Sequence, residues 1–437
     1  MEQIKRLVSD DTLYLTNNDI FIAKKGKNID INTLINKAKE HNPKYIISNV
    51  RTNHNGVIYY KNINKLEKNL TKDYNVNPKI IGVTGTNGKT STTTIIYNLL
   101  KKLNQKVMLI GTNGVYFEDK YFKTRNTTPS KLSILYLINK YLDNNSYLVI
   151  ELSSQSYNRI KDFKIDYLIY TNLSNEHLDY HKTMNRYFKA KLKIMDLLKD
   201  KSKLYVNLDD KYSNKILKKY KNAKTYSLKD LEIINNDPIE FKYDNEIIKS
   251  GLSGDFNIYN IYSSFMLLKE IFNQEELKKY INDLDKIEGR NNVYHYNSNL
   301  IVIDYAHTPE SMNKIISHYK NLNHNHIYVL FGFGGNKDKK KRPMMIHEAL
   351  KFTEYIILTE DNSRTESFID IIKSSLIPNL NNLTIIQDRK EAIKYSINKL
   401  SSKDILLILG KGNEEYLLKN GLTIPYSDKE EVFKWIL

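Results

Sequence analysis

The chain has no cysteine among its 437 residues. Disulfides, thiolate metal sites and cysteine nucleophiles are therefore excluded. No apolar run is long enough to cross a bilayer, and residues 1–6 lack the apolar core of a signal peptide. These absences predict a cytoplasmic protein without membrane insertion.

Positive charge is in excess, because 67 Lys and Arg residues face 50 Asp and Glu residues, which gives a net charge of +17. Such an excess can indicate a nucleic-acid-binding surface. Here the lysines are spread along the whole chain, among many Asn, Ile and Tyr residues, which is typical of a compositional bias of the coding genome. We therefore favour solvated Lys-rich helix faces and predict no nucleic-acid partner. A basic surface still attracts anionic substrates such as nucleotides.

The length and the apolar fraction of 41% suit an α/β protein of several domains. Residues 1–77 alternate short apolar runs with polar turns and predict a small α/β domain. Residues 78–291 alternate strands and helices, which predicts a central P-loop-type domain with a mostly parallel sheet. The same alternation in residues 292–437 predicts a C-terminal, doubly wound Rossmann-like domain. The strands expected in the last two domains are 79–84, 106–111, 146–151, 167–173, 203–207, 300–304, 326–331, 355–359, 383–387 and 404–409.

The most informative segment is a glycine-rich loop at residues 82–91. A β-branched strand precedes the loop and a helix, expected over 92–100, follows it. Backbone N–H groups in such a loop, together with the positive end of the helix, can hold the phosphates of a nucleotide. Lys89 would reach the β- and γ-phosphates, and the Thr90 hydroxyl would bind Mg²⁺. The alternative is a Gly- and Asn-rich turn with a chance Lys-Thr pair, since Val83 stands where the strict P-loop template has glycine.

Acidic and histidine side chains follow two further strands of the central domain. Glu151 ends one strand and could bind the Mg²⁺ that a nucleotide carries, although a solvated strand end is the simpler interpretation. The next strand runs into a segment at 174–181 with one Glu, two His and one Asp. Such a cluster at a strand end favours metal or phosphate chemistry. Lys191 lies on the following helix, and spacing alone does not single it out.

Together these motifs resemble the Mur ligase family, from about residue 80 to the end of the chain. The resemblance implies a fold of three domains, which take the UDP-sugar, ATP and the incoming amino acid. It implies ATP-driven amide formation through an acyl phosphate, within peptidoglycan precursor synthesis, by a protein we expect to be monomeric. The matching segments are 84–90, 126–129, 151–155, 171–181, 207–210, 252–260, 289–290, 304–309, 331–338, 341–343, 361–364 and 410–414.

The resemblance also implies the roles of individual residues. It gives catalytic roles to Lys89, His177 and Lys191, and it predicts that CO₂ carbamylates Lys191. The residues implied in metal binding are Thr90, Glu151, His177 and Lys191, with Mg²⁺ as the ion. The residues implied in ATP binding are Gly85, Thr86, Asn87, Gly88, Lys89, Thr90, Asn260, Arg290 and Asp304. The residues implied in contacts with the UDP-MurNAc-dipeptide are Asn126, Thr127, Thr128, Ser153, Arg159 and Lys161.

The amino acid to be added is indicated by four residues at 361–364. In the branch of the family that adds meso-diaminopimelate, a motif Asp-Asn-Pro-Arg reads the second carboxylate, and here it reads Asp361, Asn362, Ser363, Arg364. A planar guanidinium suits bidentate recognition of a carboxylate. The resemblance also predicts that Lys337, in place of a family arginine, binds carboxylate, and that Gly410 and Glu414 hold the far amino end. We therefore expect a diamino diacid such as diaminopimelate or lanthionine.

Two departures keep an alternative open. Arg159 and Lys161 stand where the family has Gln-x-Arg, and the short first domain lacks an Asp-Ser-Arg signature near residues 15–21. The alternative is another Mur-type ligase, such as folylpolyglutamate synthetase or a ligase acting on a non-peptidoglycan acceptor. A nucleic-acid-dependent P-loop NTPase, or a binding protein without catalysis, is the rival from a different class.

Overall fold

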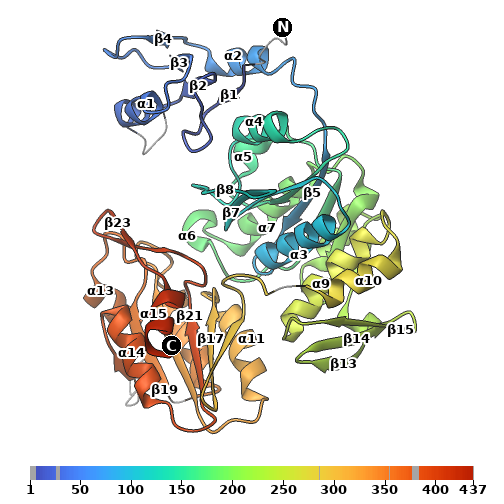
Figure 1. Ribbon diagram of the computed structural model, residues 1–437, viewed down its shortest axis with the longest axis vertical. Helices are drawn as coiled ribbons and strands as arrows, with labels where there is room; N and C mark the ends of the chain where they lie inside the picture. The colour runs from blue at the N-terminus through green and yellow to red at the C-terminus, as the bar shows by residue number, and fades with distance from the viewer. Residues whose placement is uncertain (1–5, 26–29, 285, 354, 376–382, 437) are drawn as a thin grey trace.

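The computed structural model describes residues 6–25, 30–284, 286–353, 355–375 and 383–436. Three sheet-bearing parts follow one another from the N-terminus to the C-terminus, and the central one lies between the other two (Figure 1). Within the described ranges no helix has the length and apolar character needed to cross a membrane. Residues 1–5, which carry the expectation about a signal peptide, lie outside the described residues.

The N-terminal part is a four-stranded parallel sheet in the order β1-β2-β3-β4. Its strand β2 (Ile20–Ala23) is fully buried, which explains its uninterrupted apolar sequence. Leu132 of the central part packs into the apolar cluster beneath this sheet, so the two parts share a core. The other elements are β1 (Val8–Ser9), β3 (Tyr45–Ser48), β4 (Val57–Tyr59), α1 (Ile31–Lys39) and α2 (Ile63–Leu70).

The central part contains an eight-stranded sheet in the order β12-β11-β10-β5-β9-β6-β7-β8. The strands from β12 to β6 are parallel, and β7 and β8 extend the sheet in antiparallel fashion. The expected mostly parallel sheet is thus confirmed. The strands are β5 (Lys79–Thr84), β6 (Val107–Gly111), β7 (Gly114–Phe117), β8 (Lys120–Phe122), β9 (Tyr147–Glu151), β10 (Tyr167–Tyr170), β11 (Leu204–Asn207) and β12 (Lys224–Tyr226).

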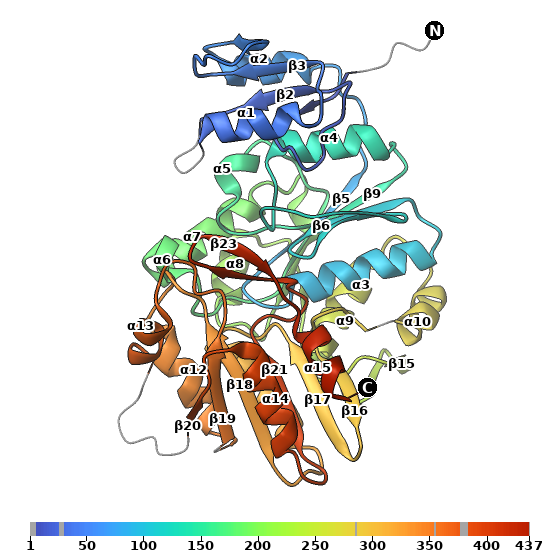
Figure 2. The same cartoon turned by 60° about the vertical axis from the view of Figure 1, so that its left-hand side comes forward.

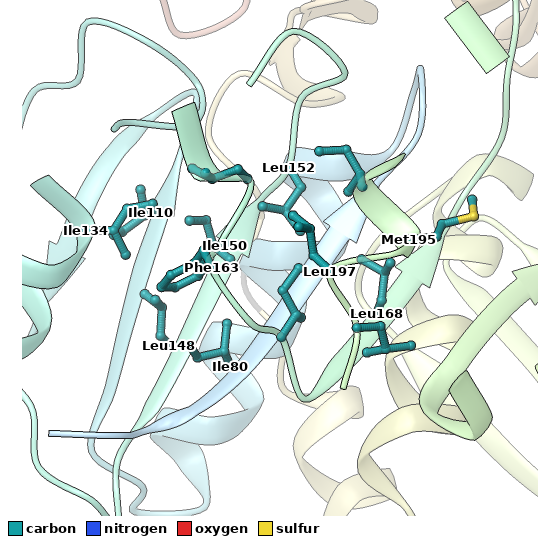
Figure 3. Close-up of a cluster of buried hydrophobic side chains, with 14 of the residues drawn as sticks. Ile80, Ile110, Ile134, Leu148, Ile150, Leu152, Phe163, Leu168, Met195 and Leu197 are labelled. Carbon is teal, nitrogen blue, oxygen red and sulfur yellow. The ribbon is translucent and has the colours of Figure 1, made fainter. Parts of the chain in front are cut away.

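Helices cover both faces of this sheet, so its strands are apolar on both sides. Leu148 and Ile150 of β9 point into one core, part of which Figure 3 shows, while Tyr147 and Val149 belong to the other. Buried runs of this kind characterise parallel sheets. The first core packs against α4 (Lys131–Tyr141), α5 (Tyr157–Ile160), α7 (Met184–Met195) and α8 (Ser213–Lys219). The second packs against α3 (Lys89–Lys102), α9 (Asp255–Leu268) and α10 (Gln274–Asn282).

Two predicted boundaries shift at the glycine-rich loop. Helix α3 begins at Lys89, earlier than expected, because Gly88 takes a left-handed conformation (φ +83°) and caps it. Strand β10 ends at Tyr170, short of residue 173, because Asn172 turns to bind the loop. Its backbone and side-chain oxygens accept hydrogen bonds from the backbone N–H groups of Thr86 and Asn87, both at 2.9 Å.

A small antiparallel sheet of three strands, which the sequence did not predict, follows the central sheet. It comprises β13 (Glu232–Asn236), β14 (Ile239–Tyr243) and β15 (Glu246–Ser250). Phe241 and Ile248 bury their side chains in the core beneath α3 and α9, which fixes this sheet to the central part.

The C-terminal part is a six-stranded sheet in the order β16-β17-β21-β18-β19-β20, parallel except for β16. Separate cores on its two faces confirm the doubly wound expectation. Its strands are β16 (Asn292–Tyr296), β17 (Asn299–Asp304), β18 (Ile327–Phe333), β19 (Tyr355–Glu360), β20 (Leu383–Ile385) and β21 (Ile405–Leu409). Its helices are α11 (Pro309–Lys320), α12 (Lys341–Leu350), α13 (Phe368–Lys373), α14 (Arg389–Lys399) and α15 (Asp428–Ile436).

A two-stranded hairpin of β22 (Tyr416–Lys419) and β23 (Leu422–Pro425) projects from the C-terminal part. Both views place β23 on the side of the C-terminal part that faces α6 (Leu178–His181) of the central part (Figures 1 and 2). The sheets fall inside the predicted ranges 1–77, 78–291 and 292–437, and those domain boundaries themselves stay a prediction.

Candidate active site

The glycine-rich loop joins β5 to α3 and lines a large cavity of about 790 Å³. A Cβ atom on Gly85 would lie 1.8 Å from the Thr171 hydroxyl oxygen, so only glycine fits there. Lys89 curls back over the loop, and its Nζ donates to the carbonyl oxygens of Gly85 (3.0 Å) and Thr86 (2.7 Å). Burial and the nearby charge of Arg290 lower the pKa of Lys89, against the attraction of Glu151 and Glu176. The loop therefore places the Lys89 amine beside backbone groups that could bind phosphate.

Lys191 lies directly beneath this loop. Helix α7 carries it there, and only 1% of the residue is exposed. Its Nζ donates to the Gly85 carbonyl at 2.7 Å and to the Thr84 hydroxyl at 3.2 Å. Burial, together with the charge of Lys89, holds the pKa of Lys191 well below its ordinary value. The amine is thus biased towards its neutral form at the centre of the site.

Glu151 ends β9 beside the loop and is 1% exposed. Its two carboxylate oxygens accept from Thr112, one from the backbone N–H (2.9 Å) and one from the hydroxyl (3.0 Å). The Thr112 hydroxyl also lies 3.1 Å from that of Thr127. A hydrogen-bonded chain therefore joins the predicted metal ligand Glu151 to a residue predicted to touch the acceptor substrate.

His177 is the N-cap residue of α6 and has a left-handed conformation (φ +57°). Burial lowers its pKa to about 4, although the carboxylate of Glu176 opposes the shift. A neutral imidazole is the form that binds metals. Among the described residues, no three His, Asp or Glu side chains converge as a complete metal site.

The chain segment that links the central and C-terminal parts places Arg290 against the loop. Its Nη2 donates to the Thr90 hydroxyl at 3.2 Å, and its guanidinium lies 4.2 Å from the centre of the Tyr305 ring. Asp304 is the last residue of β17 and accepts from the backbone N–H groups of Asn291 (2.8 Å) and Ala306 (2.7 Å). Burial raises the pKa of Asp304.

Asn260 reaches the loop from helix α9. Its Oδ1 accepts from the Thr92 hydroxyl at 3.1 Å, and a Cβ on Gly88 would approach that oxygen to 2.7 Å. Like Arg290 and Asp304, it lines the large cavity. The three positions outside the loop that are predicted to bind ATP therefore converge on one cavity although they come from three separate segments.

The residues predicted to touch the acceptor substrate mostly line the same cavity. Asn126, Thr127, Ser153 and Arg159 do so. Thr128 is fully buried behind them, where its hydroxyl donates to the Glu151 carbonyl at 2.7 Å and accepts from the Ser153 backbone N–H at 3.0 Å.

Arg159 and Lys161 differ in their placement. Arg159 donates from Nη2 to the Thr128 carbonyl at 3.0 Å and lines the cavity. Lys161 is exposed at the end of α5 and is not among the residues that line the cavity. Of the two basic residues that replace Gln-x-Arg, the structure therefore brings the first to the site.

A second, smaller cavity of about 210 Å³ lies at the C-terminal part and adjoins the first. All six residues predicted to bind the amino acid line it, namely Lys337, Asp361, Asn362, Arg364, Gly410 and Glu414. The two cavities share seven lining residues, which are Glu176, His177, Tyr305, His307, Lys337, Arg364 and Glu414.

The smaller cavity is lined by side chains of both charges. Lys337 and Arg364 supply positive charge. Near them, Glu414 accepts at one oxygen from Lys411 (2.9 Å) and Asn362 (2.8 Å), and Lys411 lies 3.6 Å from Asp361. The buried Lys411 thus lies near both carboxylates. A ligand with both ammonium and carboxylate groups fits this distribution.

Several residues that the sequence analysis did not single out complete the site. His307 of the C-terminal part faces the Tyr305 carbonyl with Nδ1 and a Glu176 oxygen with Nε2, both at 2.8 Å. His307 thus links the C-terminal part to Glu176 of the central part. Arg125 lines the large cavity and donates to the Thr12 hydroxyl at 2.6 Å, and it lies 3.4 Å from Asp11. His307 lies within a recognised motif, whereas no sequence signal marked Arg125.

A three-part α/β fold with a phosphate loop, a buried lysine beneath it and a second charged cavity defines a nucleotide-dependent ligase. Residues 83–268 match the Mur ligase middle domain, and residues 289–412 match the Mur ligase, glutamate ligase domain. The chain belongs to the Mur ligase family, and it is an ATP-dependent enzyme that forms amide bonds.

Its relatives include two UDP-N-acetylmuramoyl-L-alanyl-D-glutamate–2,6-diaminopimelate ligases. That of Fusobacterium nucleatum is 34% identical, over 96% of this chain and 91% of the relative. That of Clostridium tetani is 31% identical, over 98% and 93%. A solved ligase of the same description has a TM-score of 0.59 at 27% identity, over 98% and 94% of the chains. MurF from Thermotoga maritima, solved with ADP, shares the fold with a TM-score of 0.69 at 18% identity, over 100% and 98%.

Proposed function

We propose that the protein adds meso-diaminopimelate, or a closely similar diamino diacid, to UDP-MurNAc-L-Ala-D-Glu at the expense of ATP. One observation carries the proposal: the cavity at the glycine-rich loop and a cavity lined by both positive and negative side chains share seven lining residues. An acyl phosphate formed in the first would meet an amine delivered from the second. The relatives named above act on this pair of substrates by name.

The chemistry needs two displacements. An oxygen of the acceptor carboxylate attacks the γ-phosphorus, which yields an acyl phosphate and releases ADP. The amine then attacks the acyl carbon, and inorganic phosphate leaves. The loop residues and Lys89 would position and neutralise the phosphates, which is the main requirement of phosphoryl transfer. Asn126, Thr127, Ser153 and Arg159 would orient the acceptor.

Mg²⁺ fits the residues beside the loop. Glu151, the Thr90 hydroxyl and neutral His177 offer the few protein ligands that Mg²⁺ takes when phosphate oxygens supply the rest. Bound there, the ion would neutralise charge on the transferring phosphoryl group.

Carbamylation of Lys191 is the second part of this proposal. A neutral amine can attack CO₂, form an N–C bond and lose a proton to water, which converts a buried neutral amine into an anionic carbamate. The support is the enclosed Nζ atom, 2.7 Å from a loop carbonyl, and its lowered pKa. A carbamate beneath the loop would offer oxygen ligands to a second Mg²⁺.

We further propose that the enzyme works as a cytoplasmic monomer without a nucleic-acid partner. Its nucleotide substrates and an uncommon free amino acid are cytoplasmic metabolites. The basic lysines are spread over the chain, which favours attraction of small anionic substrates over a defined nucleic-acid surface.

The deciding experiment measures phosphate release with ATP, Mg²⁺ and UDP-MurNAc-L-Ala-D-Glu against a panel of meso-diaminopimelate, lanthionine and L-lysine. We expect turnover with the two diacids and at least tenfold lower kcat/KM with L-lysine, which lacks the second carboxylate. A parallel arm offers a folate-type acceptor with glutamate, and a third adds DNA or RNA. Turnover confined to either of those arms contradicts the proposal.

A further inference from the structure

Arg364 adopts a backbone conformation that is uncommon for residues other than glycine. Its φ angle is +55°, in the left-handed region, and its neighbours hold it there. It lies in the loop after β19, at the rim shared by the two cavities. What holds Arg364 therefore decides where its guanidinium lies.

The hairpin β22–β23 holds the backbone. The Arg364 N–H donates to the Leu418 carbonyl at 2.8 Å, and the Asn420 N–H donates to the Arg364 carbonyl at 2.5 Å. This isolated parallel bridge pairs Arg364 with Lys419. The Leu418 N–H also donates to Oδ1 of Asn362, at 2.9 Å. The segment 361–364 is thus paired to the hairpin as a short extra strand.

Three side chains reinforce this pairing. Glu360, the last residue of β19, is 7% exposed. Its Oε2 accepts from Lys419 Nζ of the hairpin at 2.8 Å, and its Oε1 accepts from the Ser363 hydroxyl at 3.2 Å. A proline at position 363, which the related motif carries, has no hydroxyl to make this bond. In this chain a hydrogen-bonded carboxylate fastens the loop and the hairpin together.

The guanidinium is oriented by two further bonds. Nη1 of Arg364 donates to the carbonyl oxygens of Gly335 and Asn362, both at 3.0 Å. Within the described ranges, no protein hydrogen bond is formed by its Nε or Nη2. Those two groups form one edge of the guanidinium, and this edge can bind a carboxylate through two hydrogen bonds.

We propose that Lys419, Glu360 and Ser363 form a clamp that positions Arg364 on the second carboxylate of the amino acid and so sets the preference for a diacid. The clamp residues act through Arg364 and are positioning residues. The inference rests on the proposed function of Arg364. It adds that the hairpin, which lies outside the substrate-binding motifs, controls specificity.

The test compares Lys419→Met and Ser363→Ala with the wild type in steady-state assays that vary each substrate separately. We expect the KM for meso-diaminopimelate to rise about tenfold, as for a weakened charge-assisted contact. The KM values for ATP and for the UDP-linked acceptor should stay within about twofold. Lys419→Arg, which keeps the ion pair with Glu360, should restore the wild-type KM for the amino acid.

Lys434→Met is the matched control. Lys434 bonds Glu431 at 2.7 Å, and that carboxylate is as buried as Glu360, but the pair lies on α15. If Lys419→Met changes no more than Lys434→Met does, the clamp is overturned. It is overturned equally if all three KM values rise together and Lys419→Arg fails to rescue, since that result indicates a structural role.

The experiment distinguishes a failure of the proposed clamp from a failure of the proposed function. Arg364→Ala provides the reference. If the wild type uses meso-diaminopimelate and Arg364→Ala impairs that use while the clamp variants do not, only the clamp is refuted. If the wild type makes no product with meso-diaminopimelate, or Arg364→Ala leaves its use unchanged, the proposed function of the pocket fails first.

Discussion

Lys191 shows how burial can change the chemistry of a single residue. The chain holds many exposed lysines, whereas this one has its amine enclosed between the Thr84 hydroxyl and the Gly85 carbonyl. Removing water disfavours the ammonium form, and the neighbouring Lys89 adds repulsion. The sequence could not single it out, because helical spacing says nothing about which lysine lies under the loop.

We predict that Lys191→Ala lowers kcat by about 100-fold or more, as expected when a group that organises charge in the site is removed. Added formate or acetate should restore part of the activity, because a small carboxylate can occupy the space of the proposed carbamate. Lys189→Ala, which alters an exposed lysine of the same helix, is the control and should leave kcat unchanged. Equal activity of the Lys191 variant with and without the added acid would argue against the carbamate.

The second prediction at the scale of residues concerns the charge of Arg364. Arg364→Ala should reduce kcat/KM for meso-diaminopimelate roughly 30-fold, because a charge-assisted contact is lost. This corresponds to a loss of about 2 kcal/mol of transition-state stabilisation. The kinetic constants for ATP should be unaffected. The measurement is kcat/KM for each substrate in turn, with Lys339→Ala, which removes an exposed lysine near the same loops, as a control for net charge. An unchanged value for the amino acid would remove Arg364 from the pocket.

At the scale of elements, one ion pair joins the loops that build the smaller cavity. Glu366 accepts from both terminal nitrogens of Arg342, a buried residue of α12, at 2.9 and 2.8 Å. It also accepts from the Asn336 backbone N–H at 2.8 Å. The hydrogen bonds from Arg342 in particular lower the pKa of Glu366 to about 2. The carboxylate thus fastens the loop after β18 to the loop after β19.

This pair predicts a pH-dependent contribution to stability. The folded-state pKa of Glu366 lies below its unfolded value of about 4.5, so its contribution is complete above pH 4.5 and decreases as the pH falls towards 2. We expect Glu366→Gln to lower the free energy of unfolding by about 2 kcal/mol at pH 7, with the difference shrinking below pH 4.5. Denaturant titrations from pH 7 to pH 3 measure it.

Glu275→Gln serves as the matched control for that experiment. Its pair with Lys278 has an exposed carboxylate, so the change should cost well under 1 kcal/mol at any of these pH values. A Glu366 difference that stays constant down to pH 3 would contradict the assignment of a lowered pKa.

The elements also show what a sequence can and cannot predict. Strands β5, β9 and β21 were predicted because burial on both faces requires an uninterrupted apolar run. Strand β13 was not predicted, since Ile233 and Ile234 are exposed there and leave no pattern of burial. The hairpin β22–β23 was missed for the same reason, as its residues are at most partly buried.

The sequence could likewise predict some residues of the candidate site but not others. The glycine-rich loop is a continuous segment, so its chemistry could be predicted locally, and the resemblance supplied the residues proposed to bind the diacid. The bond between Arg125 and Thr12 spans 113 positions, and that between His307 and Glu176 spans 131. Such pairs depend on how the parts pack against each other, which no local pattern records.

At the scale of the whole molecule, the large cavity collects residues from the central and C-terminal parts, and Arg125 ties it to the N-terminal part. His307 and Arg290 bond central residues from one side. On the other side, Asp10 of the N-terminal part accepts from the Ser130 and Ser133 hydroxyls at the start of α4, at 2.6 and 2.7 Å. A substrate that reaches from the phosphate loop towards the N-terminal part would pass Arg125.

Because of this position, a substitution of Arg125 tests how the acceptor substrate is bound. The side chain is 43% exposed, lines the large cavity and contacts Asp11 and Thr12 of the N-terminal part. A guanidinium there complements the diphosphate of a UDP-sugar, whose other end carries the carboxylate towards Lys89.

We predict that Arg125→Ala raises the KM for UDP-MurNAc-L-Ala-D-Glu about tenfold and leaves the KM values for ATP and the amino acid unchanged. Arg186→Ala removes the same charge from an exposed site on α7 outside the cavity lining and should change none of the three. If Arg125→Ala lowers thermal stability and raises all three KM values alike, the residue serves only to join the two parts, and the diphosphate must be held elsewhere.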